Sequence, residues 1–572
     1  RGGGCVVMAD YVLGIWDGHD SGAALVQGNR VLAAINEERL TRRKLEIRFP
    51  ELSIKACMQM AGLSPSDIKT VAVSTADFAK TLARLIPSTK EEYYLIRRRK
   101  KAPGLMSTLK KKAKYSITEI GPSGLTRSLS TYCINSELSR LGFSKYRTLV
   151  VDHHLCHAAS AAYWSGFDPC LVLTVDGIGD GLSGTVNRLE NGRLSRLAQI
   201  PGRDSLGIFF EHVTNLMNMR ELEDEGKVMA IANYAYPIPD SDNPMLDLIA
   251  IDGMQVRSRY GSQRMYTELR KLLWKYPSEQ FAYMAQRTLE VKVSRLASNC
   301  LRITGLRRLA LAGGVFSNIK LNMQIRLLPE ADQCCVFPHM GDGGLALGAA
   351  FQANNELHGV AAYTAPDVYW GLSYTDEEML TAIRQSGYSY SAHDDIALTT
   401  AQLIAGGNIV FWLQGGMEYG PRSLGRRSIL ALPNSTRIKD LLNLRLKMRV
   451  WYQPFCPSML AEEAPELLEN HDGLINRFMT MGYMVKQDRR SDMQGVMSID
   501  GSCRPQFVTD NEPLYRQLLQ ELKKLTGTGV VLNTSFNVHG DPLVCSPQDA
   551  LETLKKTSND YLVMGRYLVK RE

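Results

Sequence analysis

The feature that most constrains this chain is a strand-turn-strand unit that occurs twice. Residues 11–35, YVLGIWDGHDSGAALVQGNRVLAAI, have the pattern of an apolar strand, an Asp-Gly turn, a second strand, a Gly-Asn turn and a third strand. Residues 171–200, LVLTVDGIGDGLSGTVNRLENGRLSRLAQI, repeat that order. Asp17-Gly18 corresponds to Asp176-Gly177, and Gly28-Asn29 corresponds to Asn191-Gly192, so each copy carries two tight-turn signals. The chain is therefore expected to contain two related halves.

Two such halves predict an α/β protein with an actin/hexokinase-like duplicated ATPase fold, which holds a nucleotide between its halves. Turns between the paired strands, such as the one at Gly177, then offer backbone N–H groups to phosphates. The intervening sequence supports this fold. RTLVVD (147–152) is a strand, residues 280–301 have helical character, and 309–325 and 335–354 each combine a strand, a glycine turn and a helix.

The length and texture of the chain suggest two domains. The 572 residues are enough for several domains, and the sequence becomes aperiodic near residue 360. We expect an actin-like domain over residues 8–360, with Met8 a plausible native start, a connecting segment over 361–392, and a second domain over 393–572. The last region alternates helix and strand again, so it is α/β or α+β in character and long enough for its own core.

Composition excludes several classes. No apolar run is long enough to cross a membrane, and the first residues lack the features of a signal peptide. Eleven cysteines at irregular spacings indicate neither a disulfide framework nor a zinc ribbon, so a cytoplasmic location is expected. The net charge is +8, and much of it lies between Arg97 and Lys114. That run is interpreted as a solvated face or, alternatively, as a flap over an anionic or acceptor substrate.

The segment HHLCHAAS (153–160) indicates a metal site. In a helix His153 and His157 share a face, as a pair of metal ligands requires, although capping and packing of a helix end explain such a pair too. Asp176 ends a strand and Asp342 opens a helix, so both belong near the strand ends where ligands collect. Taken alone, each aspartate has another interpretation: Asp176 as an aspartate of a phosphate-binding turn, and Asp342 as the N-cap of a helix. Together the four form a mixed nitrogen and oxygen set that suits Fe(II), Mn(II) or Zn(II).

Other residues of the first region are candidates for nucleotide and proton chemistry. Gly313-Gly314 is a close-approach turn before a helix, on which Asn318 and Asn322 share a face suited to a nucleoside; tight strand-helix packing is the alternative. Gly226 and Lys227 offer a backbone approach and a cation for a phosphate, unless they lie in a surface loop. His19, after the first Asp-Gly turn, is placed to take a proton from an attacking hydroxyl, whereas a capping or core role is the alternative.

The second region carries basic residues in glycine, proline and small-polar contexts. GMEYGPRSLGRRSIL (416–430) contains arginines suited to gripping an oxyanion with planar donors. Farther along the chain are a lysine, two more arginines and a small-polar stretch, LNTSFN. We interpret these residues as one phosphate or carbamoyl phosphate pocket, with scattered surface charge as the alternative: Arg422, Arg426, Arg427, Lys447, Arg449, Arg504, Asn533, Ser535 and Asn537.

The motifs resemble a known family. HHLCHAAS, TVDGIGD, SLGIFFEHVT, EGKVMA, LAGGVFSN, GDGGLALGAA, GPRSLGRRSIL, PFCPSML and LNTSFNVHGDPLVCSP are similar to those of the O-carbamoyltransferases of the nodulation-protein and antibiotic-tailoring type, in the same order over nearly the whole chain. The resemblance implies an actin-like N-terminal domain and a YrdC-like C-terminal domain. In such enzymes carbamoyl phosphate and Mg-ATP give carbamoyl-adenylate in the second domain, and an acceptor hydroxyl attacks it near a metal in the first.

Carried over to this sequence, the resemblance implies an iron ion on His153, His157, Asp176 and Asp342, with His19 as base. It places Arg422, Lys447, Arg504 and Ser535 at carbamoyl phosphate and ATP. One departure is that Gln453 stands where the family has arginine, in QPFCPS instead of RPFAPS, which removes a charge. Three consequences are open: weaker binding of the donor, a different donor, or compensation by Arg449. The early motif EERLTRRKLE also lacks a histidine that often follows the basic pair.

The partners expected from this interpretation are ATP, carbamoyl phosphate and a small-molecule or glycan acceptor with a hydroxyl group. Neither a membrane nor a nucleic acid is expected, and a homodimer is left open. Three other functions compete with carbamoyl transfer: an actin-like kinase for small molecules, a tRNA-modifying or RNA-binding protein suggested by the positive charge, and a regulatory protein without catalysis suggested by Gln453.

Overall fold

The computed structural model describes residues 10–101, 117–364 and 367–571 and divides into two compact units. The N-terminal unit comprises Arg1–Thr41 and Leu45–Ala365, and the C-terminal unit comprises Arg42–Lys44 and Pro366–Glu572. The range predicted as a connecting segment, 361–392, contains helix α14 (Asp376–Ser386) and strand β13 (Ser389–Ala392). Both fold with the C-terminal unit, where β13 pairs with its sheet.

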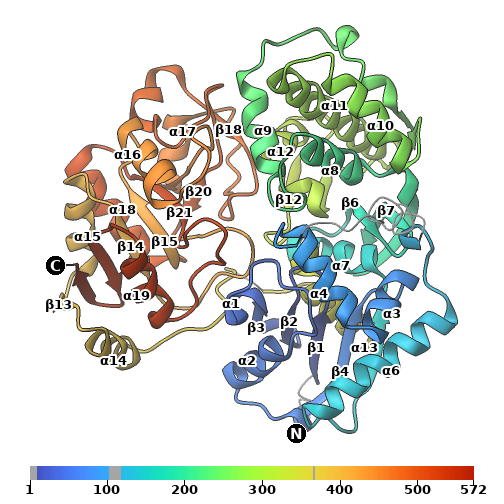
Figure 1. Ribbon diagram of the computed structural model, residues 1–572, viewed down its shortest axis with the longest axis horizontal. Helices are drawn as coiled ribbons and strands as arrows, with labels where there is room; N and C mark the ends of the chain where they lie inside the picture. Colours follow the sequence, from blue (N-terminus) through green and yellow to red (C-terminus); the bar gives the residue numbers. More distant parts are fainter. Residues whose placement is uncertain (1–9, 102–116, 365–366, 572) are drawn as a thin grey trace, which may run out of the picture. The chain divides into compact units, whose positions relative to one another are not determined.

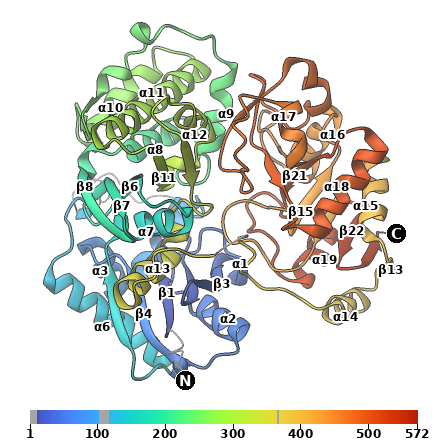
Figure 2. The ribbon, with the colours of Figure 1, turned by 180° about the vertical axis from the view of Figure 1, so that it is seen from behind.

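The N-terminal unit contains two five-stranded sheets with one topology (Figures 1 and 2). The first has the order β3-β2-β1-β4-β5, and the second has the order β8-β7-β6-β11-β12. In each, three strands form an antiparallel meander and two more strands add in parallel to its first strand. The strands are β1 Tyr11–Trp16, β2 Gly22–Gln27, β3 Arg30–Asn36, β4 Ile68–Ser74, β5 Arg147–Val151, β6 Cys170–Gly179, β7 Leu182–Glu190, β8 Arg193–Pro201, β11 Arg308–Ala312 and β12 Gln333–Val336. The predicted duplication and the actin/hexokinase-like fold are therefore confirmed.

Three of the four turn predictions are correct, and the one at Asp176-Gly177 is wrong. Asp17 and Gly18 begin the connection of residues 17–21 between β1 and β2. Gly28-Asn29 and Asn191-Gly192 are the two-residue turns between β2 and β3 and between β7 and β8. Asn191 and Gly192 have φ values of 51° and 71°, as a type I′ turn requires. In contrast, Asp176 and Gly177 do not form a turn, because β6 continues through them to Gly179 with an irregular register.

The two helices that follow the last strand of each sheet pack against one another and exchange sheets. Helix α7 (His153–Ser165) follows β5 but packs on β6, β7 and β11, whereas α13 (Leu345–His358) follows β12 and packs on β1, β2 and β4. Glycines make this close approach feasible. A Cβ atom on Gly348 would lie 2.1 Å from the carbonyl oxygen of Cys156, and one on Gly14 would lie 1.9 Å from that of Ala346. The first half thus supplies a helix to the second half of the unit.

Further helices surround these sheets. Helices α8 to α11 cluster beside the second sheet (Figure 1), and α3 packs against α6 beside the first. The remaining elements of this unit are α1 Glu38–Thr41, α2 Glu51–Ala61, α3 Phe78–Leu85, α4 Ser88–Arg97, α6 Gly124–Arg140, α8 Leu206–Leu216, α9 Glu225–Ile231, α10 Ser262–Leu273, α11 Ser278–Thr304, α12 Ile319–Arg326 and the hairpin β9 Ile249–Asp252 with β10 Gln255–Ser258.

The C-terminal unit has a mixed eight-stranded sheet in the order β13-β23-β22-β14-β15-β21-β16-β20, as expected for a YrdC-like α/β domain. Helices α15 and α18 pack on it through apolar residues such as Ile404, Leu518 and Trp412. Its other elements are β14 Val410–Leu413, β15 Arg427–Ala431, β16 Cys456–Leu460, β20 Gln506–Val508, β21 Val530–Ser535, β22 Tyr561–Met564, β23 Tyr567–Lys570, a small sheet of β17 Leu468–Glu469, β18 Tyr483–Val485 and β19 Ser502–Cys503, and the helices α15 Ile396–Ala405, α16 Thr436–Leu441, α17 Ala464–Leu467, α18 Pro513–Thr526 and α19 Pro547–Lys556.

Two expectations from composition concern the whole chain. Within the described ranges, every helix is too short or too polar to span a bilayer. None of the ten cysteines in those ranges takes part in a disulfide bond.

Candidate functional site

Helix α7 begins at the carboxyl end of β5, and a side chain from the other half fixes its start. The backbone N–H of His153 donates to Oδ2 of Asp180 at 2.7 Å, and Oδ1 of Asp180 accepts from the N–H of Ala76. Burial, followed by the neighbouring carboxylate of Asp77, raises the pKa of Asp180 to about 6. A carboxylate at the first turn of a helix is favoured by the helix dipole. Asp180 therefore fixes the position from which both metal-ligand candidates project.

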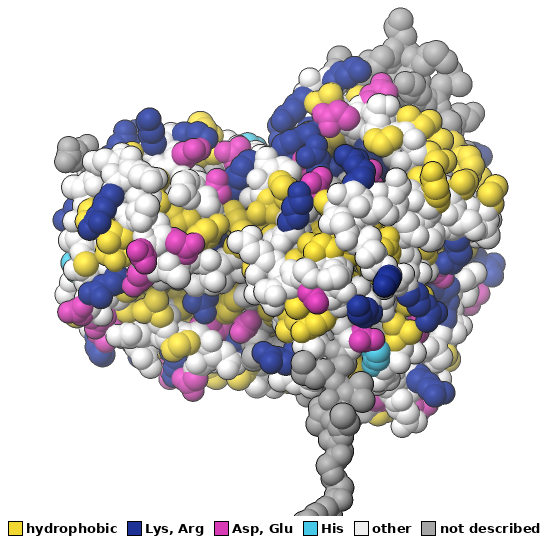
Figure 3. Space-filling view, turned by 90° about the horizontal axis from the view of Figure 1, so that it is seen from below, with side chains coloured by type: hydrophobic (Ala, Val, Ile, Leu, Met, Phe, Trp, Pro, Cys, Tyr) yellow, Lys and Arg dark blue, Asp and Glu magenta, His cyan; other side chains and the backbone are white. Residues whose placement is uncertain are grey.

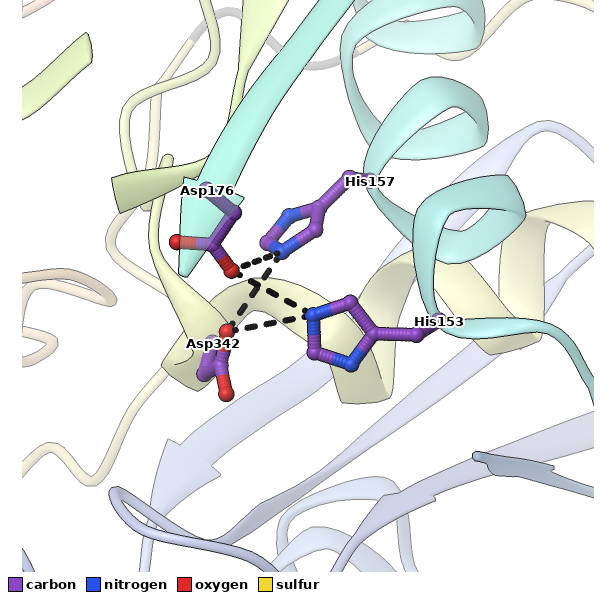
Figure 4. Close-up of side chains that lie close together, drawn as sticks. All are labelled: His153, His157, Asp176 and Asp342. Carbon is purple, nitrogen blue, oxygen red and sulfur yellow. Dashed lines mark hydrogen bonds and ion pairs between the residues drawn. The ribbon is translucent and has the colours of Figure 1, made fainter. Parts of the chain in front are cut away.

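The four predicted metal ligands converge at this point (Figure 4). His153 and His157 project from one face of α7 toward Asp176 on β6 and Asp342, which precedes α13. The Nε2 atoms of His153 and His157 lie 3.3 and 3.2 Å from Oδ2 of Asp176, and 3.5 and 3.4 Å from Oδ1 of Asp342. One atom from each side chain lies within 4.8 Å of the other three. Two imidazole nitrogens and two carboxylate oxygens thus face a common point.

The atoms of these side chains that face away from the common point have their own partners. Oδ1 of Asp176 accepts the N–H of Gly314 at 2.9 Å, and Oδ2 of Asp342 lies 3.1 Å from Nε2 of His19. Nδ1 of His153 lies 3.2 Å from Oγ1 of Thr75. Partners of this kind orient metal ligands and set the histidine tautomer. Thr75 has a φ of 72°, an unusual conformation for a β-branched residue, and such strain occurs preferentially at functional sites.

The electrostatics of the four residues couple their protonation. Burial alone would lower the pKa of His157, but hydrogen bonds to Asp176 and Asp342 outweigh burial and raise that pKa to about 9. Burial would raise the pKa of Asp176, whereas the hydrogen bonds from the two histidines hold it well below its usual range. In the metal-free protein a proton therefore occupies the position between imidazole and carboxylate, and a metal cation would displace it.

This donor set fits a transition metal. Histidine nitrogen and carboxylate oxygen suit iron, manganese or zinc, and four protein ligands leave positions open for substrate oxygens in a six-coordinate ion. The two other groups of HHLCHAAS do not join the set. Both ring nitrogens of His154 are engaged, Nδ1 with Oγ1 of Thr174 and Nε2 with the carbonyl oxygen of Leu182. Cys156 is fully buried, and its Sγ lies 3.9 Å from the carbonyl oxygen of Val151.

The glycine turn predicted to bind a nucleotide lies directly against the metal-site candidate. Gly313 has a φ of 106°, and a Cβ there would lie 2.2 Å from the carbonyl oxygen of Val175. A Cβ on Gly314 would lie 2.7 Å from Oδ1 of Asp176. Glycine is required at both positions because the turn contacts β6 and positions Asp176. This packing was the alternative interpretation of the Gly-Gly pair, and a nucleotide role stays a prediction.

The other nucleotide-binding candidates have protein partners. Asn318 is the N-cap of α12 rather than part of the helix, and it exchanges two hydrogen bonds with Gln286. Asn322 donates to the carbonyl oxygen of Phe316. Gly226 and Lys227 lie in the first turn of α9 and not in a loop, and Nζ of Lys227 pairs with Asp224 at 2.7 Å. Gly177 lies within β6, where its carbonyl oxygen accepts from Ser205.

In the C-terminal unit, three of the predicted arginines lie around one cysteine. The guanidinium of Arg504 donates from Nε and Nη2 to Sγ of Cys456, at 3.2 and 3.0 Å. Burial and then the charge of Arg504 lower the pKa of Arg422, and the same two causes lower that of Arg449. Nε of Arg422 and Nη2 of Arg449 are buried without a hydrogen-bond partner among the described residues. This arrangement suits an anion, because like charges repel and free donors remain.

Lys447 and Ser535 form a second part of the predicted pocket. Nζ of the buried Lys447 donates to Oγ of Ser535 at 3.3 Å and to Oδ1 of Asn537 at 2.7 Å. Burial, followed by repulsion from Arg449, lowers the pKa of Lys447 well below its usual range. The backbone carbonyl oxygen of Gln453 accepts from Asn443, which also accepts from Nε of Arg449. Gln453 and Arg449 are thus joined through one asparagine.

Two other predicted residues build the scaffold of this pocket instead of facing it. Asn533 on β21 is buried and donates to Ser423 and Ser458. Arg427 is fully buried, and its guanidinium donates to carbonyl oxygens, including those of Gln414 and Leu372. Arg427 is therefore not a free anion binder. The third arginine of this loop, Arg426, stacks on Tyr369 at 4.3 Å.

Several structurally important residues were missed from the sequence. Oε1 of Glu418 accepts the N–H groups of Leu424, Arg426 and Arg427 and so shapes the arginine loop. Glu418 lies in the motif GMEYGPRSLGRRS, but a glutamate beside glycines and arginines is equally compatible with an exposed position. Thr75, Asp180 and the cations around Asp17, described below, were also missed. Among these, Lys80 and Arg84 in FAKTLARL have the i, i+4 spacing that signals a common helix face.

The described start of the basic run has internal partners. Arg97 pairs with Glu211 at 3.5 Å, and Arg98 pairs with Glu223. Arg99 donates to Asn218 and to the carbonyl oxygen of Met219. These three arginines join α4 and the residues after it to the second half of the unit, with Arg98 buried and Arg99 exposed. Residues 102–114 of the predicted run lie outside the described residues.

The sheets and the two clusters define an actin-like protein with an additional α/β domain. Comparison with known proteins specifies the family. The model for the carbamoyltransferase N-terminus matches residues 11–351, and the model for the carbamoyltransferase C-terminus matches residues 401–571. The chain therefore belongs to the carbamoyltransferase family, and transfer of a carbamoyl group is its general activity.

Individual relatives agree with this assignment. The chain is 34% identical to nodulation protein NolNO of Sinorhizobium fredii over 97% of this chain and 79% of that protein. It is 34% identical to nodulation protein NolO of Bradyrhizobium diazoefficiens over 74% of this chain and 79% of that protein. Among solved structures, HypF of T. kodakarensis is similar with a TM-score of 0.35 and 15% identity, over 62% of this chain and 49% of that chain.

Proposed function

We propose that the protein is an ATP-dependent, metal-dependent O-carbamoyltransferase that proceeds through carbamoyl-adenylate. The observation that carries the proposal is the convergence of His153, His157, Asp176 and Asp342 beside His19. Family membership supplies carbamoyl transfer, and this cluster supplies a place for the metal-dependent step. A bound metal, for which iron is the first candidate and manganese or zinc the alternatives, would act as a Lewis acid and orient substrate oxygens.

The C-terminal unit is proposed to activate the donor. Arg422, Arg449 and Arg504 present positive charge with free donors, which suits the phosphates of carbamoyl phosphate and Mg-ATP. Lys447, held by Ser535 and Asn537, adds a buried amine donor. Water first cleaves the P–O bond of carbamoyl phosphate, which gives carbamate and inorganic phosphate. Attack of the carbamate oxygen on the α-phosphorus of ATP then forms a new P–O bond and releases pyrophosphate. The product, carbamoyl-adenylate, has AMP as a stabilised leaving group, whereas free carbamate is a poor electrophile.

In the N-terminal unit, His19 is proposed to accept the proton of the acceptor hydroxyl. Its Nε2 lies 3.1 Å from Asp342, and its side chain is 29% exposed, so it is accessible to an incoming hydroxyl. The hydroxyl oxygen then forms a C–O bond to the carbamoyl carbon and AMP leaves with the bonding electrons. Asp342 stabilises the imidazolium that results. We propose a small molecule or glycan as the acceptor.

The direct test uses the full chain with ATP, carbamoyl phosphate and Fe(II) under anaerobic conditions. We expect pyrophosphate and carbamoyl-adenylate, both detected by mass spectrometry, without an acceptor present. Absence of both products would refute the adenylation step. Arg422→Gln should abolish pyrophosphate release, because Arg422 offers a buried, unpaired donor. Arg445→Gln is the matched control, since Arg445 is exposed in the same region and should leave the reaction unchanged.

The metal-site half of the proposal has a separate test. His157→Ala removes one ligand and is expected to abolish carbamoyl transfer from preformed carbamoyl-adenylate while pyrophosphate release continues. Far-UV circular dichroism should be unchanged, and metal content should fall on elemental analysis. Full transfer activity in this variant would remove His157 from the reaction site.

Two alternative functions make different predictions. A kinase of the actin-like class would add phosphate instead of a carbamoyl group to its product, and it would not need the arginines around Cys456. An RNA-binding protein would show salt-sensitive binding of RNA in a filter assay. On the face in Figure 3, basic side chains are interspersed with acidic ones, which argues against a continuous phosphate-binding stripe there.

A further inference from the structure

The first half of the N-terminal unit contains a charge cluster that no step of the proposed reaction uses. Asp17 occupies the position in the first sequence copy that Asp176 occupies in the second. Its carboxylate is buried and bound by three cations. Nζ of Lys80 lies 3.0 Å from Oδ1, Nη2 of Arg84 lies 2.8 Å from Oδ1, and Nζ of Lys90 lies 2.9 Å from Oδ2. With both lysines protonated, these four groups carry a net charge of +2.

The donors of this cluster are unequally used. Nε and Nη2 of Arg84 donate to Asp17, and its Nη1 and Nη2 donate to the carbonyl oxygens of Thr75 and Ser74, so this guanidinium is saturated. Among the described residues, Nζ of Lys80 makes one polar contact, with Asp17, and both polar contacts of Nζ of Lys90 are with Asp17 as well. An ammonium group has three donors. Each lysine therefore retains donor capacity although its side chain is only 10% exposed.

Burial of three cations around one carboxylate costs free energy, and stabilisation of the fold does not explain why the protein bears that cost. One arginine already satisfies the carboxylate, and each further cation loses hydration and repels its neighbours. Burial, followed by repulsion from Lys90 and Arg84, outweighs the attraction of Asp17 and lowers the pKa of Lys80 to about 7. The cluster thus lacks negative charge, and a bound oxyanion would supply it.

The cluster adjoins the metal-site candidate. Nζ of Lys80 lies 4.2 Å from the centroid of the Trp16 ring, and the same ring lies 5.8 Å from the ring of His153, centroid to centroid. A second connection runs through Thr75, whose carbonyl oxygen accepts from Arg84 and whose hydroxyl contacts His153. A ligand at the metal site and an oxyanion beside Lys80 would therefore be neighbours across a single indole ring.

We infer that Lys80 and Lys90, held on Asp17, form an oxyanion subsite beside the metal-site candidate. Its ligand is a phosphate or a similarly small oxyanion that belongs to one of the reactants. Two sources have this chemistry: the phosphate of the adenylate donor and an anionic substituent on the acceptor. The identification of these sources rests on the proposed carbamoyl transfer, but the subsite itself binds an oxyanion whether or not that reaction occurs.

The test is calorimetric titration of the full chain with inorganic phosphate, without ATP, carbamoyl phosphate or metal. Lys80→Met and Lys90→Met should each weaken one class of phosphate sites at least about 10-fold, because a charge-assisted hydrogen bond is lost. Lys69→Met, a change of an exposed lysine on β4, is the control and should have no effect. Lys90→Arg should largely restore binding. Binding retained in both methionine variants would overturn the subsite.

Two further arms assign the source of the anion. If the donor phosphate occupies the subsite, saturating AMP abolishes the phosphate binding that depends on Lys80. If an acceptor group occupies it, that binding persists with AMP present. The arginines around Cys456 also attract phosphate, so each titration is repeated with Arg422→Gln in the background, where the loss caused by Lys80→Met should remain. Loss of the Lys80 effect in that background would contradict a separate subsite.

Discussion

The two halves of the N-terminal unit use equivalent aspartates in opposite ways. Asp176 faces two imidazoles and another carboxylate, and this set can exchange a proton for a metal cation. Asp17 faces two ammonium groups and a guanidinium, which remain with the protein. The sheets are topologically identical, so the difference arises from the helices that reach each aspartate. Helices α3 and α4 supply the cations to Asp17, and α7 supplies the histidines to Asp176.

The comparison shows how a duplicated fold acquires two chemistries. Exchange of α7 and α13 between the sheets brings the histidines of the first half to the aspartates of the second. One aspartate then lies in the candidate metal site, and its counterpart is paired with three cationic side chains of the protein. The overall result is a divided reaction region, with a candidate metal centre on one side of Trp16 and excess positive charge on the other.

The largest expected effect distinguishes the two aspartates by metal content. Asp176→Asn should lower both metal affinity and carbamoyl transfer by more than about 100-fold. This loss exceeds the roughly 10- to 100-fold loss that follows when a residue that only orients a metal ligand is changed. Asp17→Asn should retain bound metal, because it leaves all four ligand candidates in place. Elemental analysis of both purified variants checks this. Equal metal loss in the two would show that the halves are not chemically distinct.

The second prediction concerns stability. Asp17→Asn leaves three buried cations without their carboxylate, so the free energy of unfolding should fall by about 3–5 kcal/mol. Adding Lys80→Met to this variant should recover part of the loss, because it removes one unpaired charge. Urea denaturation of the metal-free proteins measures both changes. A loss below about 1 kcal/mol for Asp17→Asn would mean that solvent screens the cluster.

The third prediction is that the two halves have opposite pH dependence in the metal-free protein. The raised pKa of His157, about 9, contributes stability that is fully present below its ordinary value of about 6.5 and is lost as pH rises through 9. The shift corresponds to about 3 kcal/mol. The lowered pKa of Asp17 contributes stability that is present above about 4 and is lost as pH falls through the lowered value.

Urea midpoints recorded from pH 3 to pH 10 check this prediction. His157→Gln should remove part of the alkaline loss, and Asp17→Asn should remove part of the acid loss. Added metal should suppress the alkaline loss, since a metal binds the neutral imidazole. Identical pH profiles for the two variants would contradict the assignment of the alkaline loss of stability to His157 and of the acid loss to Asp17.

The smallest expected effect tests Thr75, which touches both halves of the comparison. Thr75→Val keeps the branched shape but removes the hydroxyl next to Nδ1 of His153, so metal affinity should fall about 10- to 100-fold. Thr75→Ser keeps the hydroxyl and should retain most of the affinity. Metal titration with a competing chelator measures the difference. Equal affinities for the valine and serine variants would exclude an orienting role for this hydroxyl.

Sequence periodicity was sufficient for the elements and part of the site. Alternating apolar residues and glycine-asparagine turns predicted the strands of both copies, because their patterns are local. The spacing of His153 and His157 predicted a common helix face for the same reason. The prediction was wrong at Asp176-Gly177, where an irregular register extends β6 by several residues. For Gly226-Lys227 the alternative of a surface loop is excluded, because both residues lie in the first turn of α9, and their phosphate role stays a prediction.

The sequence by itself determined the duplication, the histidine pair and the family motifs. The motifs also predicted Asp176 as a partner of the histidines. Only the tertiary structure decided that the matching aspartate, Asp17, would face two lysines and an arginine. The partners of Asp17 come from α3 and α4, which lie 60 or more residues farther along the chain. The histidines that face Asp176 come from α7, which follows the last strand of the other half. Local propensity carries no information about such distant partners, whereas packing of α7 and α13 across the sheets fixes them.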